Sequence, residues 1–261
     1  MQDFEQTLKA GREALEIGEF KQAAKAFKQA LALAPERTEL YFILGEALAE
    51  DGQIKEAIAA YERGLKDHPE ELDALYDLGD LYFEGQQPER ALTTYQRIIE
   101  LDPREADALV SSGLVHFQQE RVERAMECYR RALDLEPDSI FALNSLGDAL
   151  YARGENEAAL ECYQRAVRLD PEDPQGHFNL AEMYYDTDDL VEAEKACRRA
   201  LSLDPGFAYA YLTLGNICLD QEKLREALQS FQEFLLHERS PDAQEIRDEV
   251  AAVIAGIKEE L

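Results

Sequence analysis

The feature that most constrains the fold of this chain is a sequence period of 34 residues. Six prolines recur at this interval without a slip: Pro35, Pro69, Pro103, Pro137, Pro171 and Pro205. In blocks of 34 counted from Phe4, the eighth place is glycine in every block but one, where it is alanine, and the twentieth place is always alanine. A period of this length predicts a stack of similar structural units.

Each block contains two helical patterns of about 14 residues. In the fifth block, Leu143, Leu146 and Leu150 recur at helical spacing, and a second pattern contains Ala159 and Tyr163. Four glycines mark the turn between the two patterns: Gly18, Gly52, Gly85 and Gly154. We expect them to supply backbone conformations that a Cβ atom hinders.

Small and aromatic residues alternate in a way that favours close helix packing. Glycine at place 8 and alanine at place 20 let the two helices of a block approach each other. The aromatic residue common at place 24, such as Tyr95, is expected to fill the gap towards the next block. A lone helical hairpin cannot bury such a face, so stability must come from the stacking of neighbouring blocks.

The pattern Leu-Gly-x2-Tyr, followed by Ala-x3-Phe/Tyr-x2-Ala-x4-Pro, resembles the tetratricopeptide repeat (TPR) family. The tryptophan that is usual at place 4 is absent. The resemblance implies an all-α fold, a right-handed α-solenoid of helix-turn-helix repeats that forms a single domain over residues 1–261. Seven repeats are expected at 4–37, 38–71, 72–105, 106–139, 140–173, 174–207 and 208–240, with a capping helix at 241–261.

The last segment has the features of a capping helix. Ser240 is expected as its N-cap and Pro241 as its first helical residue. One apolar stripe runs along an otherwise polar helix: Ile246, Val250, Val253, Ile254 and Ile257. We expect this stripe to cover the stacking face of the seventh repeat.

The sequence contains no recognisable catalytic or metal-binding pattern. The four histidines lie in different repeats without ligand spacing, and no glycine-rich phosphate loop, nucleophile elbow or HExxH motif is present. Repeats and cap account for the whole chain. We therefore expect no enzymatic activity, no catalytic residues, no metal and no cofactor.

The charge balance bears on partners and location. With 27 basic and 55 acidic residues, the net charge of -28 repels nucleic acid and anionic lipid. No run of about 18 apolar residues or secretory signal is seen in the chain as given, which indicates no membrane span. Four cysteines without a CxxC pair are consistent with a reducing compartment, so a cytoplasmic location is expected.

The resemblance also implies that the first helices line a concave groove, which places 2, 5, 9, 12 and 13 of each repeat would face. Those places carry thirteen acidic side chains, one basic side chain (Arg12) and nine aromatic ones. We predict that the groove binds its partner through Glu39, Phe42, Glu46, Asp73, Tyr76, Asp80, Phe83, Asp107, Phe117, Phe141, Asn144, Asp148, Tyr151, Phe178, Glu182, Tyr185 and Tyr209.

Carboxylates among aromatic rings suit a basic peptide or helix with apolar anchors. The leading hypothesis is a non-catalytic scaffold or adaptor that binds a basic protein partner. Self-association into a structural assembly and a chaperone role for a secretion or assembly substrate are the alternatives. Two further alternatives concern the groove itself: its aromatic residues only pack between helices, and its acids only keep the protein soluble.

A ladder of arginines, one per repeat near the end of the second helix, comprises Arg63, Arg97, Arg131, Arg165 and Arg199. The ladder is interpreted as a solvated outer face with the i,i+4 pairs Glu127–Arg131 and Glu161–Arg165. An anion-binding stripe is the alternative.

Overall fold

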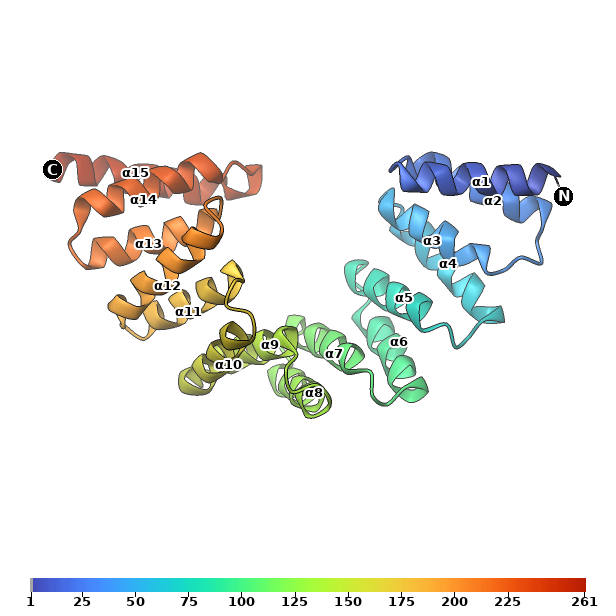
Figure 1. Ribbon diagram of the computed structural model, residues 1–261, viewed down its shortest axis with the longest axis horizontal. Helices are drawn as coiled ribbons and strands as arrows, with labels where there is room; N and C mark the ends of the chain where they lie inside the picture. The colour runs from blue at the N-terminus through green and yellow to red at the C-terminus, as the bar shows by residue number, and fades with distance from the viewer. Residues whose placement is uncertain (1) are drawn as a thin grey trace. The chain divides into compact units, whose positions relative to one another are not determined.

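The computed structural model describes residues 2–261, and within them α-helices are joined by turns, loops and one short 3-10 helix, with no strand (Figure 1). These helices group into two compact units. The N-terminal unit extends to Leu135, and the C-terminal unit covers Glu136–Leu261. The single-domain interpretation stays a prediction.

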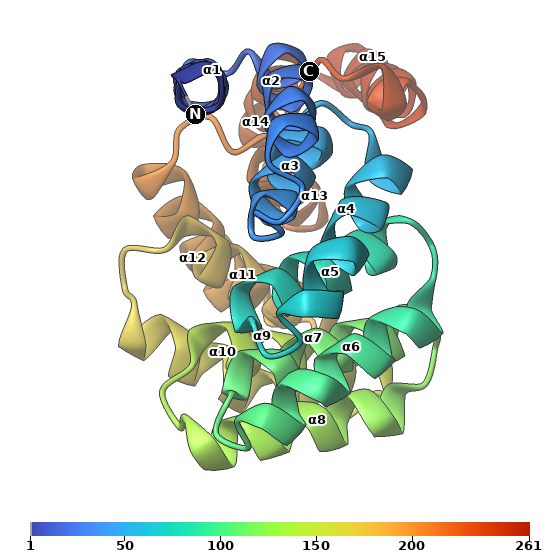
Figure 2. The same ribbon diagram turned by 90° about the vertical axis from the view of Figure 1, so that its right-hand side faces the viewer.

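Every predicted repeat contains one helical hairpin. The first helices of the hairpins are α1 (Gln2–Glu16), α3 (Leu40–Glu50), α5 (Leu72–Glu84), α7 (Ala106–Gln118), α9 (Ile140–Ala152), α11 (Pro174–Asp186) and α13 (Ala208–Asp220). The second helices are α2 (Phe20–Leu33), α4 (Ile54–Asp67), α6 (Pro88–Leu101), α8 (Val122–Leu135), α10 (Asn156–Leu169), α12 (Leu190–Leu203) and α14 (Leu224–His237). Within each unit, a second helix packs on the first helix of its own repeat and of the next one (Figure 1 and Figure 2).

The close approach of the two helices in a repeat depends on the glycine at place 8. A Cβ atom added to Gly147 would lie 2.6 Å from Cε1 of Tyr163, and one added to Gly79 would lie 2.5 Å from Cε1 of Tyr95. The ring at place 24 therefore packs on the glycine of its own repeat, and the hydroxyl of Tyr61 also reaches Asp77 of the next repeat. The expectation that the ring fills the gap towards the next block stays a prediction. In the sixth repeat alanine takes the glycine place, and the ring is replaced by the smaller Cys197.

The turn between the two helices has a left-handed residue at place 15 of every repeat. Gly18, Gly52 and Gly154 have φ values of +77°, +74° and +76° there. The other four repeats carry non-glycine residues with positive φ: Gln86, Glu120, Asp188 and Glu222. The prediction for Gly85 was wrong by one residue, because its φ is -71° and the left-handed conformation falls on the next residue.

The C-terminal segment packs on α14 as a cap, but it begins later than predicted. Ser240 makes no side-chain capping hydrogen bond, and Pro241 opens a 3-10 turn, η1 (Pro241–Ala243), before α15 (Gln244–Glu260). Of the predicted stripe, Val250, Ile254 and Ile257 are buried, Ile246 is half-buried and Val253 is exposed.

No helix within residues 2–261 combines the length and the apolar character needed to cross a membrane.

Candidate functional site

The predicted binding residues lie on α3, α5 and α7 in the N-terminal unit and on α9, α11 and α13 in the C-terminal unit, or at the N-terminal boundaries of these helices. We call the side chains at places 2, 5, 9, 12 and 13 of these helices the first-helix face. The face is hollowed by a pocket in each unit, and the two pockets have different linings.

The pocket of the N-terminal unit, the acidic pocket, lies between α3 and α5 and has a volume of about 510 Å³. Five carboxylates and no basic side chain line it, together with Ala49, Tyr61 and Leu81; the carboxylates are Glu46, Glu50, Asp77, Asp80 and Glu84. Sequence reasoning missed Asp77, because it stands at place 6, outside the places that the resemblance assigns to the groove.

Crowding and burial shift the ionisation of this pocket. Burial, followed by the charges of Asp77 and Glu50, raises the pKa of Glu46. Burial also raises the pKa of Asp77, and the charges of nearby aspartates add to the shift. Since both shifts oppose the charged form, an incoming cation would gain from neutralising these carboxylates.

Tyrosine hydroxyls from the second helices bond to carboxylates of the first helices. Tyr95 donates to Oδ1 of Asp80 at 2.5 Å, and Tyr163 donates to Oδ1 of Asp148 at 2.7 Å. Tyr61 donates to Oδ2 of Asp77 in the next repeat at 2.8 Å. Burial raises the pKa of all three phenols, so they stay protonated as donors. These contacts hold the carboxylates in place and were not foreseen from the sequence.

The pocket of the C-terminal unit, the mixed pocket, lies among α9, α10, α11 and α13 and has a volume of about 390 Å³. Its lining combines carboxylate, phenol, amide, hydroxyl and apolar groups: Asp148, Tyr151, Tyr163, Asn179, Glu182, Met183, Tyr185, Asp186, Leu212, Thr213 and Asn216. At its rim, Tyr151 donates to Asp186, and Tyr185 donates to Asp220 at 2.7 Å. Each of these bonds joins one repeat to the next.

The predicted aromatic residues differ in how accessible they are. Phe141, Tyr151 and Tyr209 are 54%, 45% and 43% exposed, so part of each side chain is accessible to a partner, although the ring of Tyr209 also packs edge-on against Phe234. Phe178 is only 8% exposed, and its ring packs on Phe207 with centroids 4.8 Å apart. Packing between helices, rather than partner contact, therefore describes Phe178, which we leave out of the proposed site.

The remaining aromatic residues are half-buried. Phe42 lies against Tyr61, with ring centroids 6.3 Å apart, and Tyr76 donates to Oε2 of Glu105 at 2.8 Å. The other half-buried residues of the predicted set are Phe83, Phe117, Asn144 and Tyr185. The N-terminal unit therefore offers carboxylates with partly covered rings, and the C-terminal unit offers carboxylates with open rings.

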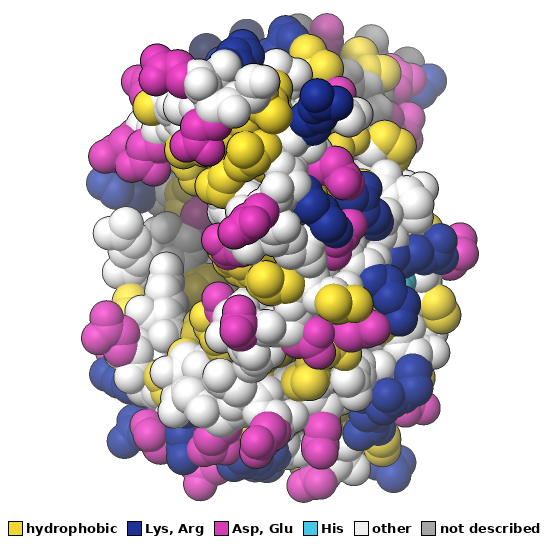
Figure 3. Space-filling model, turned by 90° about the vertical axis from the view of Figure 1, so that its left-hand side faces the viewer, with side chains coloured by type: hydrophobic (Ala, Val, Ile, Leu, Met, Phe, Trp, Pro, Cys, Tyr) yellow, Lys and Arg dark blue, Asp and Glu magenta, His cyan; other side chains and the backbone are white. Residues whose placement is uncertain are grey.

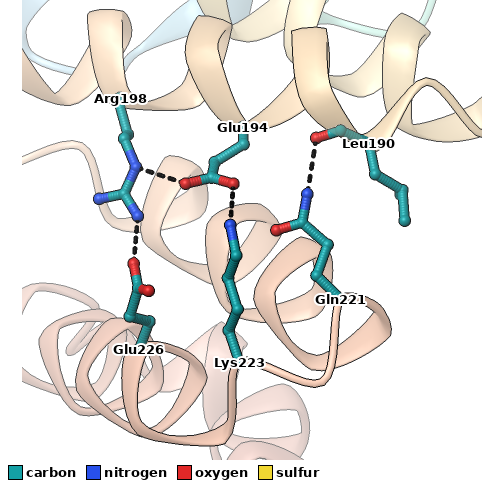
Figure 4. Close-up of polar contacts among 6 residues, drawn as sticks. All are labelled: Leu190, Glu194, Arg198, Gln221, Lys223 and Glu226. Atoms are coloured by element: carbon teal, nitrogen blue, oxygen red, sulfur yellow. Dashed lines mark hydrogen bonds and ion pairs between the residues drawn. The ribbon is translucent and has the colours of Figure 1, made fainter.

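Several carboxylates of the second helices, by contrast, are paired with cations. Glu194 of α12 lies 2.8 Å from Nε of Arg198 and 2.7 Å from Nζ of Lys223, and Arg198 also reaches Glu226 at 2.5 Å (Figure 4). Beside them, the side-chain amide of Gln221 donates to the carbonyl of Leu190 at 3.1 Å. Figure 3, which views the side of the C-terminal helices, shows acidic and basic side chains interspersed.

The N-terminal unit has the same kind of pairing on its second helices and in the turn before α8. Arg90 pairs with Glu62, and Arg121 pairs with Glu89 at 3.0 Å. On the first-helix face, Glu39 pairs with Arg37. Within residues 2–261, the other predicted acids have no basic side chain within 4.0 Å: Glu46, Asp73, Asp80, Asp107, Asp148 and Glu182.

Two arginines of the ladder, Arg165 and Arg199, bind the connections between repeats. Arg165 donates to the carbonyl of Pro137 and lies 3.4 Å from Asp138, so the predicted pair with Glu161 was wrong. Arg199 repeats the contact one period later, with the carbonyl of Pro171 at 3.3 Å. These two guanidinium groups each tie a second helix to the loop that precedes its own repeat.

No group of three or more His, Cys, Asp or Glu side chains in the described part of the chain is arranged to hold a metal ion.

Comparison with family models identifies the repeats. Tetratricopeptide repeat models match residues 8–71, 50–103 and 76–140, and another matches residues 174–207; a TPR repeat model matches residues 147–188. No curated protein gives a significant match.

Solved structures with a similar fold include a tetratricopeptide repeat protein from Parabacteroides merdae, with a TM-score of 0.77 at 20% identity over 98% of this chain and 100% of that one. Yeast Tom70 has a TM-score of 0.73 at 19% identity over 98% of this chain and 55% of its own. The APC/C hetero-tetramer Cut9-Hcn1 has a TM-score of 0.68 at 17% identity over 92% of this chain and 48% of that one. These likenesses confirm the predicted all-α TPR solenoid fold.

Proposed function

The chain belongs to the tetratricopeptide repeat family, and from that premise we propose that it is a scaffold which binds a basic protein segment on its first-helix face. Tetratricopeptide repeats are generally non-catalytic interaction modules. One similar fold is found in the APC/C hetero-tetramer Cut9-Hcn1, an assembly of different proteins. The family supports an interaction role, and the chemistry of the partner is our inference from the side chains.

The observation that carries the proposal is how the carboxylates of the first-helix face are held. Some acids of the second helices, such as Glu194, have cations beside them, whereas Glu127 and Glu161 have none within 4.0 Å among residues 2–261. Acids on the first-helix face, such as Asp80 and Asp148, have tyrosine hydroxyls as partners and no cation within 4.0 Å among residues 2–261. A charged surface that is fixed in place by neutral donors keeps its charge available for a basic partner.

Aromatic rings are the second feature that we propose for recognition of the partner. Phe141, Tyr151 and Tyr209 are exposed on first helices of the C-terminal unit, and Tyr151 lines the same pocket as Asp148. Such rings bury apolar side chains and attract cations over their faces. The favoured partner therefore carries lysine or arginine together with apolar anchors.

The test compares two triple variants that change the net charge equally. One reverses acids of the first-helix face (Glu46→Lys, Asp73→Lys and Asp107→Lys). The other reverses exposed acids of the second helices (Glu56→Lys, Glu127→Lys and Glu161→Lys). Stopped-flow fluorescence measures the association of a labelled peptide of arginine, lysine and leucine, with a glutamate-containing peptide as the negative control.

We expect the first-helix variant to associate at least about tenfold more slowly, and the second-helix variant to be much less affected. Binding by the unmodified protein should weaken as the Debye length falls from about 10 Å at 0.1 M salt to about 3 Å at 1 M. Equal losses in both variants, or no salt dependence, would overturn the proposal. A mass that grows with concentration in light scattering would favour self-assembly instead.

A further inference from the structure

The mixed pocket of the C-terminal unit has features that a general preference for cations does not require. Its carboxylates come from two helices, Asp148 from α9 and Glu182 and Asp186 from α11. Amide groups of Asn179 and Asn216 complete the lining, and no basic side chain is part of it. Hydrogen-bond acceptors therefore approach one hollow of about 390 Å³ from three helices.

The carboxylates of this pocket are already held by neutral donors. Tyr163 donates to Oδ1 of Asp148, Tyr151 donates to Oδ2 of Asp186, and Thr213 bonds to Glu182. Each carboxylate keeps a second oxygen for a ligand. Partial burial raises the pKa of Asp148 and of Glu182, and the charge of Asp186 adds to the second shift, so a cation beside these groups would favour their charged forms.

We propose that the mixed pocket is a subsite for an arginine side chain of the bound segment. A guanidinium is planar and carries five N–H donors, which suits acceptors that arrive from several directions, whereas an ammonium is a compact point charge. The guanidinium is also more weakly hydrated, so it loses less hydration than an ammonium does when it leaves bulk water. It stacks on aromatic faces, and the ring of Tyr151 is held at the rim by its bond to Asp186 while 45% of the residue stays exposed.

The acidic pocket of the N-terminal unit provides the contrast within the same chain. It is larger, at about 510 Å³, and its polar lining consists of five carboxylates and one tyrosine, with no amide. Such a lining attracts lysine and arginine alike, because it offers charge without the directional amide and aromatic contacts. Selectivity for arginine is therefore assigned to the mixed pocket.

This subsite rests on the proposed function, and one methionine reports on it directly. The chain has three methionines, of which Met183 lines the mixed pocket and Met126 is buried in the N-terminal unit. With 13C-methyl methionine in the full chain, blocked tripeptides that have arginine, lysine or citrulline between two leucines are titrated while the methyl signals are followed. Citrulline keeps the planar shape of arginine without its charge.

We expect the Met183 signal to move and saturate with the arginine peptide, with an affinity at least about tenfold higher than for the lysine or citrulline peptide. Asp148→Asn and Glu182→Gln, which keep size and hydrogen-bonding capacity, should each weaken arginine binding. Glu161→Gln, on the exposed side of α10, is the matched control and should not. Melting curves check that the variants fold.

The outcomes separate the subsite from the function on which it rests. Equal affinity for arginine and lysine overturns the arginine subsite and leaves a basic-partner function standing. The Met183 signal could also stay unchanged while the larger basic peptide still binds the first-helix face. That result likewise overturns the arginine subsite and leaves the basic-partner function standing. Citrulline binding as well as arginine, together with no loss in the first-helix triple variant, overturns both.

Discussion

Replacing Gly79 by alanine tests the steric basis of the repeat. A Cβ atom at this position would lie 2.5 Å from Cε1 and 3.0 Å from Cδ1 and Cζ of Tyr95. Carbon atoms pack best at about 3.5–4.0 Å, so the ring would have to retreat by about 1 Å. The ring cannot move by this amount without disturbing its neighbours, because Tyr95 is 1% exposed and its hydroxyl is bonded to Asp80.

The change in the free energy of unfolding that Gly79→Ala causes follows from two opposing effects. Overpacking of a filled core costs about 1–3 kcal/mol, and an immobile ring places this site in the upper half of that range. Alanine in a helix interior gains about 1 kcal/mol over glycine. We therefore expect Gly79→Ala to lower the free energy of unfolding by about 1–2 kcal/mol. Gly256→Ala in α15 is the matched control, since nothing lies within 4 Å of its added Cβ, and it should stabilise by up to about 1 kcal/mol.

The assay is hydrogen exchange with mass spectrometry, because an array of repeats need not unfold in one step. Protection of α5 and α6 should fall in Gly79→Ala, and protection of α15 should rise in Gly256→Ala. In a double-mutant cycle, Gly79→Ala should destabilise the Tyr95→Leu variant less than the unmodified protein, since the smaller side chain leaves room for the new methyl group. If Gly79→Ala stabilises as Gly256→Ala does, or if the cycle shows no coupling, the steric reasoning is refuted.

Three further predictions concern other parts of the chain. Removing residues 241–261 should lower the melting temperature, because burial of each of the three buried apolar side chains of α15 stabilises the fold by about 1.5–3 kcal/mol. The truncated chain should also associate through the newly exposed face of α14. A monomer of unchanged stability would refute the capping role of α15. Glu120 has a φ of +58°, so Glu120→Gly should raise the urea midpoint by relieving strain worth about 1 kcal/mol, and a lower midpoint would contradict this. The pKa values of Glu46 and Asp148 are raised in the folded protein, so the folded state binds more protons above the unfolded pKa of about 4. These two groups should therefore make the protein more stable as the pH falls from neutral through their raised pKa values, and Glu46→Gln with Asp148→Asn should reduce that slope in urea titrations.

The sequence alone was enough to predict the hairpins, because the residues that fix helix packing recur at constant spacing. Glycine at place 8 and a ring at place 24 are required by one contact in nearly every repeat, and the alanine at place 20 is buried in every repeat. The turn could not be located as well. The left-handed residue of the turn always stands at place 15, which Gln86 and Glu222 occupy as well as glycine. A prediction based on residue type therefore chose Gly85, the glycine one residue earlier.

The negative charge of the candidate site could be predicted from the sequence. The side-chain contacts within the site were harder to predict. Acids at the groove places could be counted from the sequence, but the bond from Tyr163 to Asp148 depends on a reach across 15 residues and between two helices. Phe178 occupied a groove place by its spacing, yet Phe207 from the following loop packs over it. Spacing gives the direction of a side chain, and only the surroundings decide whether it stays accessible.

Carboxyl footprinting tests the central claim most directly, because it shows which acids a partner covers. Carbodiimide-driven labelling of the full chain is compared with and without the basic, leucine-containing peptide, and each site is quantified by mass spectrometry. We predict that the exposed carboxylates of Asp73 and Glu182 lose labelling when the peptide binds, whereas Glu127 and Glu161 on the second helices do not change. Protection of the second-helix acids with unchanged labelling of the first-helix face would contradict the account.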